Sequence, residues 1–260
     1  SAELPVLQIT WARYFFTVVF IFPLMLIFFK KYLVWTDKPK LQLIRGLILL
    51  TANISFFYSI SVISLPKALT LAFVAPLVVT TFSPFFLGET VGYRRWAAVI
   101  IGFIGSLVVI RPGFLEINLA SLAALGTGIM YGFYLIITRK LSTSDNPLLT
   151  LLLTGVVGAI IATTFMPFVW VSPTFNQWSI MAAIGLFACI GHLFIILSLK
   201  YADASKLAPF SYFEIVTNII IAYFFFGDFP DSWTFSGLFI IVFSGIYISR
   251  RENIIKNIKI

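Results

Sequence analysis

The sequence has little charge. Only 11% of its 260 residues are Asp, Glu, Lys or Arg, whereas an average soluble domain carries about 25%. Hydrophobic residues make up 60% of the chain, and Phe alone accounts for 29 residues. So few polar side chains cannot cover a soluble core. The composition therefore excludes a soluble globular enzyme, a disordered protein and, despite the net charge of +8, a nucleic-acid-binding protein.

The chain is also poor in residues that carry out chemistry. It has a single cysteine, Cys189, and a single histidine, His192. A disulfide needs two cysteines, and metal sites are built from several His, Cys or carboxylate ligands. The sequence contains no glycine-rich loop ending in Gly-Lys that would bind a nucleotide phosphate. We therefore expect no catalytic residue, no cofactor and no resident metal.

Long apolar stretches fill the chain instead. A helix that spans a membrane needs about 20 apolar residues. Nine stretches meet or approach this length, at 6–29, 42–64, 68–87, 96–110, 119–138, 148–170, 178–199, 207–226 and 234–249. The connections between them are too short to form a separate domain, so the sequence predicts one all-α integral membrane protein.

The basic residues fall unevenly on the two sides of such a bundle. If successive connections alternate between the sides, 15 of the 18 basic residues share one side. They are Lys30, Lys31, Lys38, Lys40, Arg45, Arg94, Arg95, Arg139, Lys140, Lys200, Lys206, Arg250, Arg251, Lys256 and Lys259. Lys and Arg are enriched in cytoplasmic loops. This side is therefore predicted to be cytoplasmic, and it carries the C-terminus.

An internal repeat explains the odd number of stretches. A shift of 139 residues places Phe85-Phe86-Leu87-Gly88-Glu89 on Phe224-Phe225-Phe226-Gly227-Asp228, and a shift near 142 places Pro5 on Pro147. The stretch at 119–138 has no partner within the chain, so we expect its counterpart before Ser1. The expected plan is two five-helix repeats in which the first helix is missing. Residues 1–113 would hold helices two to five, and residues 114–260 would hold helices six to ten and a short basic tail.

An odd number of helices in each repeat turns the second copy upside down. Inverted repeats related by an axis in the membrane plane are typical of secondary transporters. In such proteins the two halves exchange conformations, and the same site opens to either side of the membrane in turn.

Several short motifs resemble the EamA-type drug/metabolite transporters. The first half carries Ser83-Pro84-Phe85-Phe86-Leu87-Gly88-Glu89, Arg94-Arg95-Trp96 and Arg111-Pro112-Gly113, and the second half carries Ala204-Ser205, Ala208-Pro209-Phe210 and Phe226-Gly227-Asp228. The resemblance implies ten helices in two inverted repeats, both termini in the cytoplasm, and transport of small metabolites. Within the family, the pattern is similar to bacterial members that include S-adenosylmethionine uptake carriers and amino-acid exporters.

Four polar residues lie well inside apolar stretches: Arg13, Asn53, His192 and Glu214. Charged and polar groups in the hydrocarbon region cost free energy, so they usually face a cavity or a partner. The 139-residue shift places Asn53 on His192. We therefore expect these residues to contribute to substrate binding.

Each of the titratable candidates has two interpretations. Glu214 suits proton coupling or a cationic substrate group, or else it pairs with Arg13 or His192 to hold two helices together. Arg13 suits a substrate carboxylate or phosphate, or else it extends to the external interface. His192 suits substrate binding or proton relay, or else it is a hydrogen-bonded packing residue.

Two aromatic residues complete the candidate site. Tyr58 and Tyr212 are close in sequence to Asn53 and Glu214, and an aromatic ring stacks on planar or cationic groups. The alternative is that they face lipid or neighbouring helices. Glu89 and Asp228 are expected to be structural, either by capping a neighbouring helix or by pairing with Arg94 or Arg95.

The sequence thus predicts a secondary active transporter of the bacterial inner membrane. Its substrate would be a small organic metabolite, such as an amino acid, an amine or a nucleoside-like compound, moved by alternating access with proton coupling or exchange. The alternatives are a membrane subunit of a larger assembly and an intramembrane enzyme. The first would need a large cytoplasmic loop to dock a motor, and the second would need more catalytic groups than Glu214 and His192.

Overall fold

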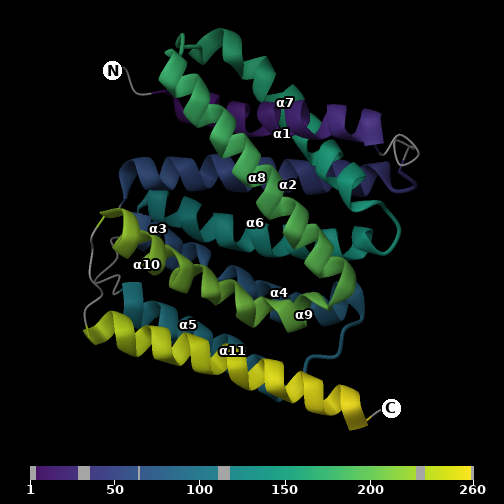
Figure 1. Cartoon of the computed structure of the whole chain (residues 1–260), viewed down its shortest axis with the longest axis vertical. Coiled ribbons are helices and arrows are strands. Elements are labelled where there is room, and N and C mark those ends of the chain that lie inside the picture. Colours follow the sequence, from purple (N-terminus) through teal and green to yellow (C-terminus); the bar gives the residue numbers. More distant parts are fainter. Residues whose placement is uncertain (1–3, 29–35, 64, 111–117, 227–231, 259–260) are drawn as a thin grey trace. The chain divides into compact units, whose positions relative to one another are not determined.

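The computed structural model describes residues 4–28, 36–63, 65–110, 118–226 and 232–258. These residues form α-helices and one 3₁₀ helix, which confirms the predicted all-α class (Figure 1). The elements are α1 (Val6–Phe28), α2 (Pro39–Val62), α3 (Leu65–Ala72), α4 (Ala75–Leu87), α5 (Tyr93–Ile110), α6 (Leu119–Ser142), α7 (Pro147–Val169), α8 (Phe175–Tyr201), α9 (Ala204–Leu207), η2 (Ala208–Tyr212), α10 (Phe213–Phe226) and α11 (Ser232–Ile258). By length and composition, α1, α2, α6, α7 and α8 are each able to cross a membrane.

Two of the predicted stretches are interrupted. The stretch expected over 68–87 is divided into α3 and α4 by a turn at Phe73 and Val74, and the stretch expected over 207–226 opens with η2 before α10. A proline stands in the first turn after each break, Pro76 in α4 and Pro209 in η2. Proline has no N–H group and fits the first turn of a helix better than its interior. Hydropathy does not register such breaks, because the residues around them are apolar.

The chain forms two compact units. The first unit is Ser1–Tyr58 with Ile137–Ala202, and the second unit is Ser59–Ile136 with Asp203–Ile260. Each unit therefore draws on both of the predicted sequence repeats. The repeat boundaries at 1–113 and 114–260 remain a prediction about sequence.

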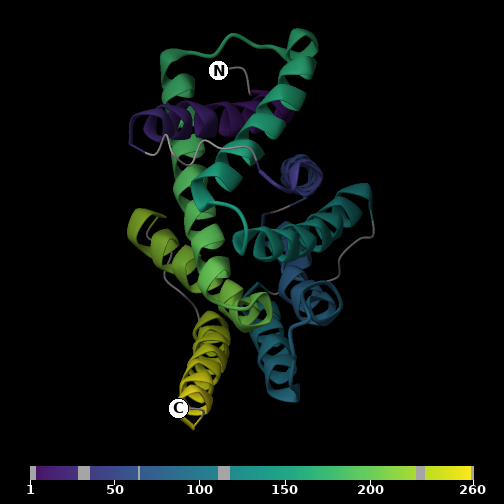
Figure 2. The same ribbon diagram turned by 90° about the vertical axis from the view of Figure 1, so that its right-hand side faces the viewer.

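In the first unit, α1 packs against α7 and α8 (Figures 1 and 2). Glycines permit this close approach, because a Cβ at Gly158 would lie 2.5 Å from Cγ of Tyr14 and one at Gly155 would lie 3.0 Å from Val18. Apolar side chains on either side of these contacts form the core, with Met25 and Ile196 in one cluster.

A polar cluster lies at the junction of α6 and α7, within the same unit. Asp145 accepts hydrogen bonds at 2.6 Å from both Thr36 and Gln42. Arg45 was counted among the basic residues of the cytoplasmic side, without a prediction of its burial. It is fully buried within α2, where it donates to the Thr138 hydroxyl at 2.7 Å and the Thr150 carbonyl at 3.1 Å. These bonds satisfy the guanidinium inside the protein, which a count of loop charges does not detect.

In the second unit, α5 packs along α11, and the two helices lie side by side in both views (Figures 1 and 2). Gly88 ends α4 in the left-handed conformation with φ of 67°. The carboxylate of Glu89, which follows it, accepts hydrogen bonds from the N–H groups of Ala204 at 2.8 Å and Ser205 at 2.9 Å. The prediction that Glu89 caps a neighbouring helix is therefore confirmed. The matching prediction for Asp228 lies outside the described residues.

Candidate functional site

The pair formed by Arg13 and His192 is the centre of the candidate site. Arg13 projects from α1 and His192 from α8, and Nη2 of the arginine lies 2.5 Å from Nε2 of the histidine. A guanidinium has donors and no acceptor. Nε2 of His192 therefore accepts the bond, and the imidazole is the neutral tautomer with its proton on Nδ1.

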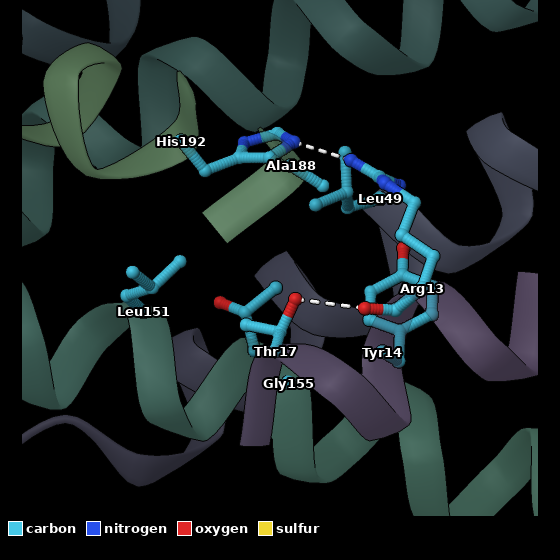
Figure 3. A pocket seen from close by; sticks show the side chains of 9 residues that line it. Arg13, Tyr14, Thr17, Leu49, Leu151, Gly155, Ala188 and His192 are labelled. Carbon is cyan, nitrogen blue, oxygen red and sulfur yellow. Dashed lines mark hydrogen bonds between the residues drawn. The ribbon is translucent and has the colours of Figure 1, made fainter. Parts of the chain in front are cut away.

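A small cavity lies beside this pair, within the first unit (Figure 3). Helices α1, α2, α7 and α8 line it, and the lining residues are Arg13, Tyr14, Thr17, Leu49, Leu151, Thr154, Gly155, Ala188 and His192. Its volume is about 10 Å³, which is room for roughly one water molecule. In Figure 3 the guanidinium of Arg13 and the imidazole of His192 are directed toward one another, with Thr17 and Leu151 across the cavity from them.

Asn53 does not line the cavity, but it bonds to two residues that do. Its amide nitrogen donates to the hydroxyl of Tyr14 at 2.7 Å and to the carbonyl of Leu49 at 2.8 Å. Both of these partners line the cavity. The structure thus gathers Arg13, His192 and Asn53 around one place, although Arg13 and His192 are separated by 179 residues in sequence.

The other three candidates lie elsewhere. Tyr58 is 37% exposed near the end of α2 and does not line this cavity. Tyr212 and Glu214 belong to the second unit. Tyr212 is fully buried, and its hydroxyl lies 3.5 Å from the carbonyl oxygen of Phe73, whereas Glu214 is exposed in the first turn of α10.

Sequence reasoning missed Thr17, Thr154 and Arg45. The hydroxyl of Thr154 accepts a hydrogen bond from Nη1 of Arg45, so the buried arginine reaches a residue that lines the cavity. The available signal was the spacing of Thr150 and Thr154, which places two hydroxyls on one face of α7. Arg45 was itself a charged residue inside an apolar stretch, as Arg13 is.

The described residues offer no obvious metal site. Among them, no group of three or more His, Cys, Asp or Glu side chains is placed so that it could hold an ion. The chemistry that the site does offer is hydrogen bonding and positive charge, supplied by one guanidinium at the cavity and a second one behind it.

Comparison with known proteins places the chain among transporters. The profile of the EamA-like transporter family matches residues 1–111 and 118–250. An S-adenosylmethionine uptake transporter of Rickettsia bellii is 26% identical over 245 residues, which is 94% of this chain and 84% of the relative. A riboflavin transporter of Vibrio cholerae is 28% identical over 192 residues, covering 72% of this chain and 63% of the relative.

Two further similarities complete the comparison. The pseudopaline exporter CntI of Pseudomonas aeruginosa is 26% identical over 215 residues, which is 81% of this chain and 75% of the exporter. A solved crystal structure with 18% identity superposes with a TM-score of 0.81 over 95% of this chain and 90% of its own. That structural match shows the fold alone.

Proposed function

Because the chain belongs to the EamA-like transporter family, we propose that it is a secondary active transporter of a small organic metabolite in the bacterial inner membrane. Its family and its named relatives indicate a membrane transporter rather than an enzyme. Four relatives from Rickettsia species are S-adenosylmethionine uptake transporters, each aligned over 94% of this chain. S-adenosylmethionine is therefore the first substrate to test.

The observation that carries the proposal is the Arg13–His192 pair beside a cavity, between helices that are mainly apolar. A membrane helix keeps a charged side chain in its interior at a cost in free energy, so such residues usually mark a substrate or ion pathway. The proposed substrate-binding residues are Arg13, Asn53, Tyr58 and His192 of the first unit and Tyr212 and Glu214 of the second unit. We take the C-terminus to be cytoplasmic, from the distribution of basic residues.

Alternating access is the proposed mechanism, supported by the internal repeat. Phe73 and Tyr212 are related by the 139-residue shift, both lie at helix breaks, and the hydroxyl of Tyr212 lies 3.5 Å from the carbonyl of Phe73. If a two-fold axis relates the two repeats, equivalent residues that lie near the axis meet each other. The contact between Phe73 and Tyr212 fits this expectation. Interrupted helices in corresponding positions of two halves are a feature of many secondary transporters.

The direct test is uptake into proteoliposomes containing the purified protein. We expect saturable accumulation of labelled S-adenosylmethionine above that of protein-free liposomes, with riboflavin and a set of amino acids as the other compounds in the panel. Failure of every compound to enter, with an imposed proton gradient or with a preloaded exchange partner, would overturn the proposal.

Glu214 is the proposed coupling residue. Its side chain is exposed in the first turn of α10, and the described residues give it no hydrogen bond or ion pair. We expect Glu214→Gln to lose uptake driven by a proton gradient and to keep exchange of internal for external substrate, because the amide occupies the same space but cannot release a proton. Asp37→Asn, at an exposed position outside the helices, is the matched control. Unchanged gradient-driven uptake by Glu214→Gln would rule out this role.

A further inference from the structure

The guanidinium of Arg13 has a donor that the protein does not use. Nη2 bonds to His192, but Nη1 is buried and has no hydrogen-bond partner among the described residues. A buried donor without an acceptor is costly and uncommon in native structures. Here it belongs to a residue that lines a cavity, so an acceptor from a bound molecule would satisfy it.

The surroundings of this donor are positively charged. No Asp or Glu is among the residues that line the cavity. Thr154 lines the cavity and accepts a hydrogen bond from Arg45. A second guanidinium is therefore one residue away from the cavity. The carboxylate of Asp145 accepts hydrogen bonds from Thr36 and Gln42 and does not line the cavity. Charges held away from water are stabilised by an opposite charge, so the cavity favours an anionic group.

The two threonine hydroxyls at the cavity already have acceptors. The hydroxyl of Thr17 donates to the carbonyl of Arg13 at 2.8 Å, and that of Thr154 donates to the carbonyl of Thr150 at 2.9 Å. Nη1 of Arg13 therefore supplies one charged donor in a space that fits roughly one oxygen atom. A carboxylate has two acceptor oxygens to satisfy and a phosphate monoester has three, so a site with a single free donor suits a carboxylate better.

We propose that Arg13 binds a carboxylate of the transported metabolite through Nη1 while Nη2 stays bonded to His192. This inference rests on the proposed transport function and narrows its substrate class. It favours a substrate such as S-adenosylmethionine, which carries an α-carboxylate, over riboflavin, which carries none.

The first experiment compares matched ligands on the wild-type protein. Binding is measured from the shift in thermal unfolding of the detergent-purified chain, and uptake is measured in proteoliposomes. The pairs are S-adenosylmethionine with its decarboxylated analogue, and methionine with methioninamide. Glycerol phosphate and riboflavin complete the panel. We expect the ligand of each pair that lacks the carboxylate to bind about 10-fold to 100-fold more weakly, as for loss of one charge-assisted hydrogen bond.

The second experiment removes the donor. Arg13→Gln should lose the preference for the carboxylate, so that both ligands of a pair bind with the same weak affinity, and Arg13→Lys should keep part of the preference because it keeps the charge. Lys140→Gln is the matched control, since it removes one positive charge from an exposed position on α6 of the same unit. The control should discriminate between the ligands as the wild type does.

The outcomes separate the two proposals. Uptake of riboflavin or of the decarboxylated analogue as efficient as uptake of S-adenosylmethionine would leave the transport function standing and overturn the carboxylate site. The carboxylate site would also be overturned if glycerol phosphate bound more strongly than every carboxylate. The same holds if Arg13→Gln kept the full preference for the ligand with the carboxylate. If no compound in the panel enters the proteoliposomes, it is the transport function that fails. Because the ligand pairs are compared on the wild type, the result does not depend on the folding of any variant.

Discussion

At the scale of single residues, the structure gives buried and half-buried polar groups definite partners far away in sequence. Arg13 reaches a histidine 179 residues away, and Glu89 reaches backbone N–H groups 115 and 116 residues away. Polar groups that are withdrawn from water must find such partners. Arg13 therefore joins α1 to α8, and Glu89 joins the end of α4 to the start of α9.

Glu89 provides a test at this scale. Its carboxylate accepts from the first two N–H groups of α9, which have no partner within that helix. We expect Glu89→Ala to lower the free energy of unfolding by about 1 kcal/mol, and Glu89→Gln to fall between Ala and the wild type, because the amide keeps one acceptor oxygen. Unfolding in detergent measures this, with Asp37→Asn as the control. A Glu89→Ala protein as stable as the wild type would show that the cap contributes nothing.

At the scale of helices, glycine decides how closely neighbours approach. In membrane proteins, helix association depends on van der Waals contact between surfaces, and small residues allow that contact. Gly158 on α7 lies against the ring of Tyr14 on α1, and Tyr14 in turn accepts the hydrogen bond from Asn53 on α2. The packing of two helices thereby sets the position of a side chain at the candidate site.

This gives a prediction with an internal control. Ala at Gly158 would place its Cβ 2.5 Å from Cγ and 2.7 Å from Cε1 of Tyr14, so the helices must separate or the ring must move. We expect Gly158→Ala to lower stability by about 1–3 kcal/mol and to weaken substrate binding. At Gly191 on α8, nothing lies within 4 Å of the added atom, so Gly191→Ala should be neutral or slightly stabilising. Equal thermal unfolding of the two variants would contradict this account.

At the scale of the whole molecule, the distribution of basic residues predicts which side of the membrane each connection occupies. Lys140 lies on the predicted cytoplasmic side at the end of α6, and Phe175 lies on the opposite side at the start of α8, where it is 89% exposed. The native Cys189 is buried at 5% exposure, so it should provide a low background for thiol labelling.

Labelling with a membrane-impermeant maleimide tests this orientation. In right-side-out membrane vesicles, Phe175→Cys should react and Lys140→Cys should not, and in inside-out vesicles the order should reverse. The chain that carries only Cys189 is the control in both preparations. The opposite order would place the C-terminus outside, and the interpretation of the 15 basic residues would be wrong.

The sequence determined the class of the protein and the positions of most helices, because hydropathy is a sum over neighbouring residues that needs no knowledge of the fold. The same summation could not find the break at Phe73 and Val74, where a proline follows within an apolar run. The motifs and the repeat also predicted the transporter family, which the family profile and the relatives confirm.

The tertiary structure decided which polar residues meet. Arg13, His192 and Asn53 were singled out in sequence as polar residues in apolar stretches. Only the packing of α1, α2, α7 and α8 shows that Arg13 and His192 line one cavity and that Asn53 bonds to residues of its wall. Arg45 was counted among the basic residues of the cytoplasmic side, and only the structure shows that it is fully buried and donates hydrogen bonds to Thr138, Thr150 and Thr154. Burial and partnership depend on contacts between distant segments, and these contacts are fixed by side-chain packing rather than by the local pattern of residues.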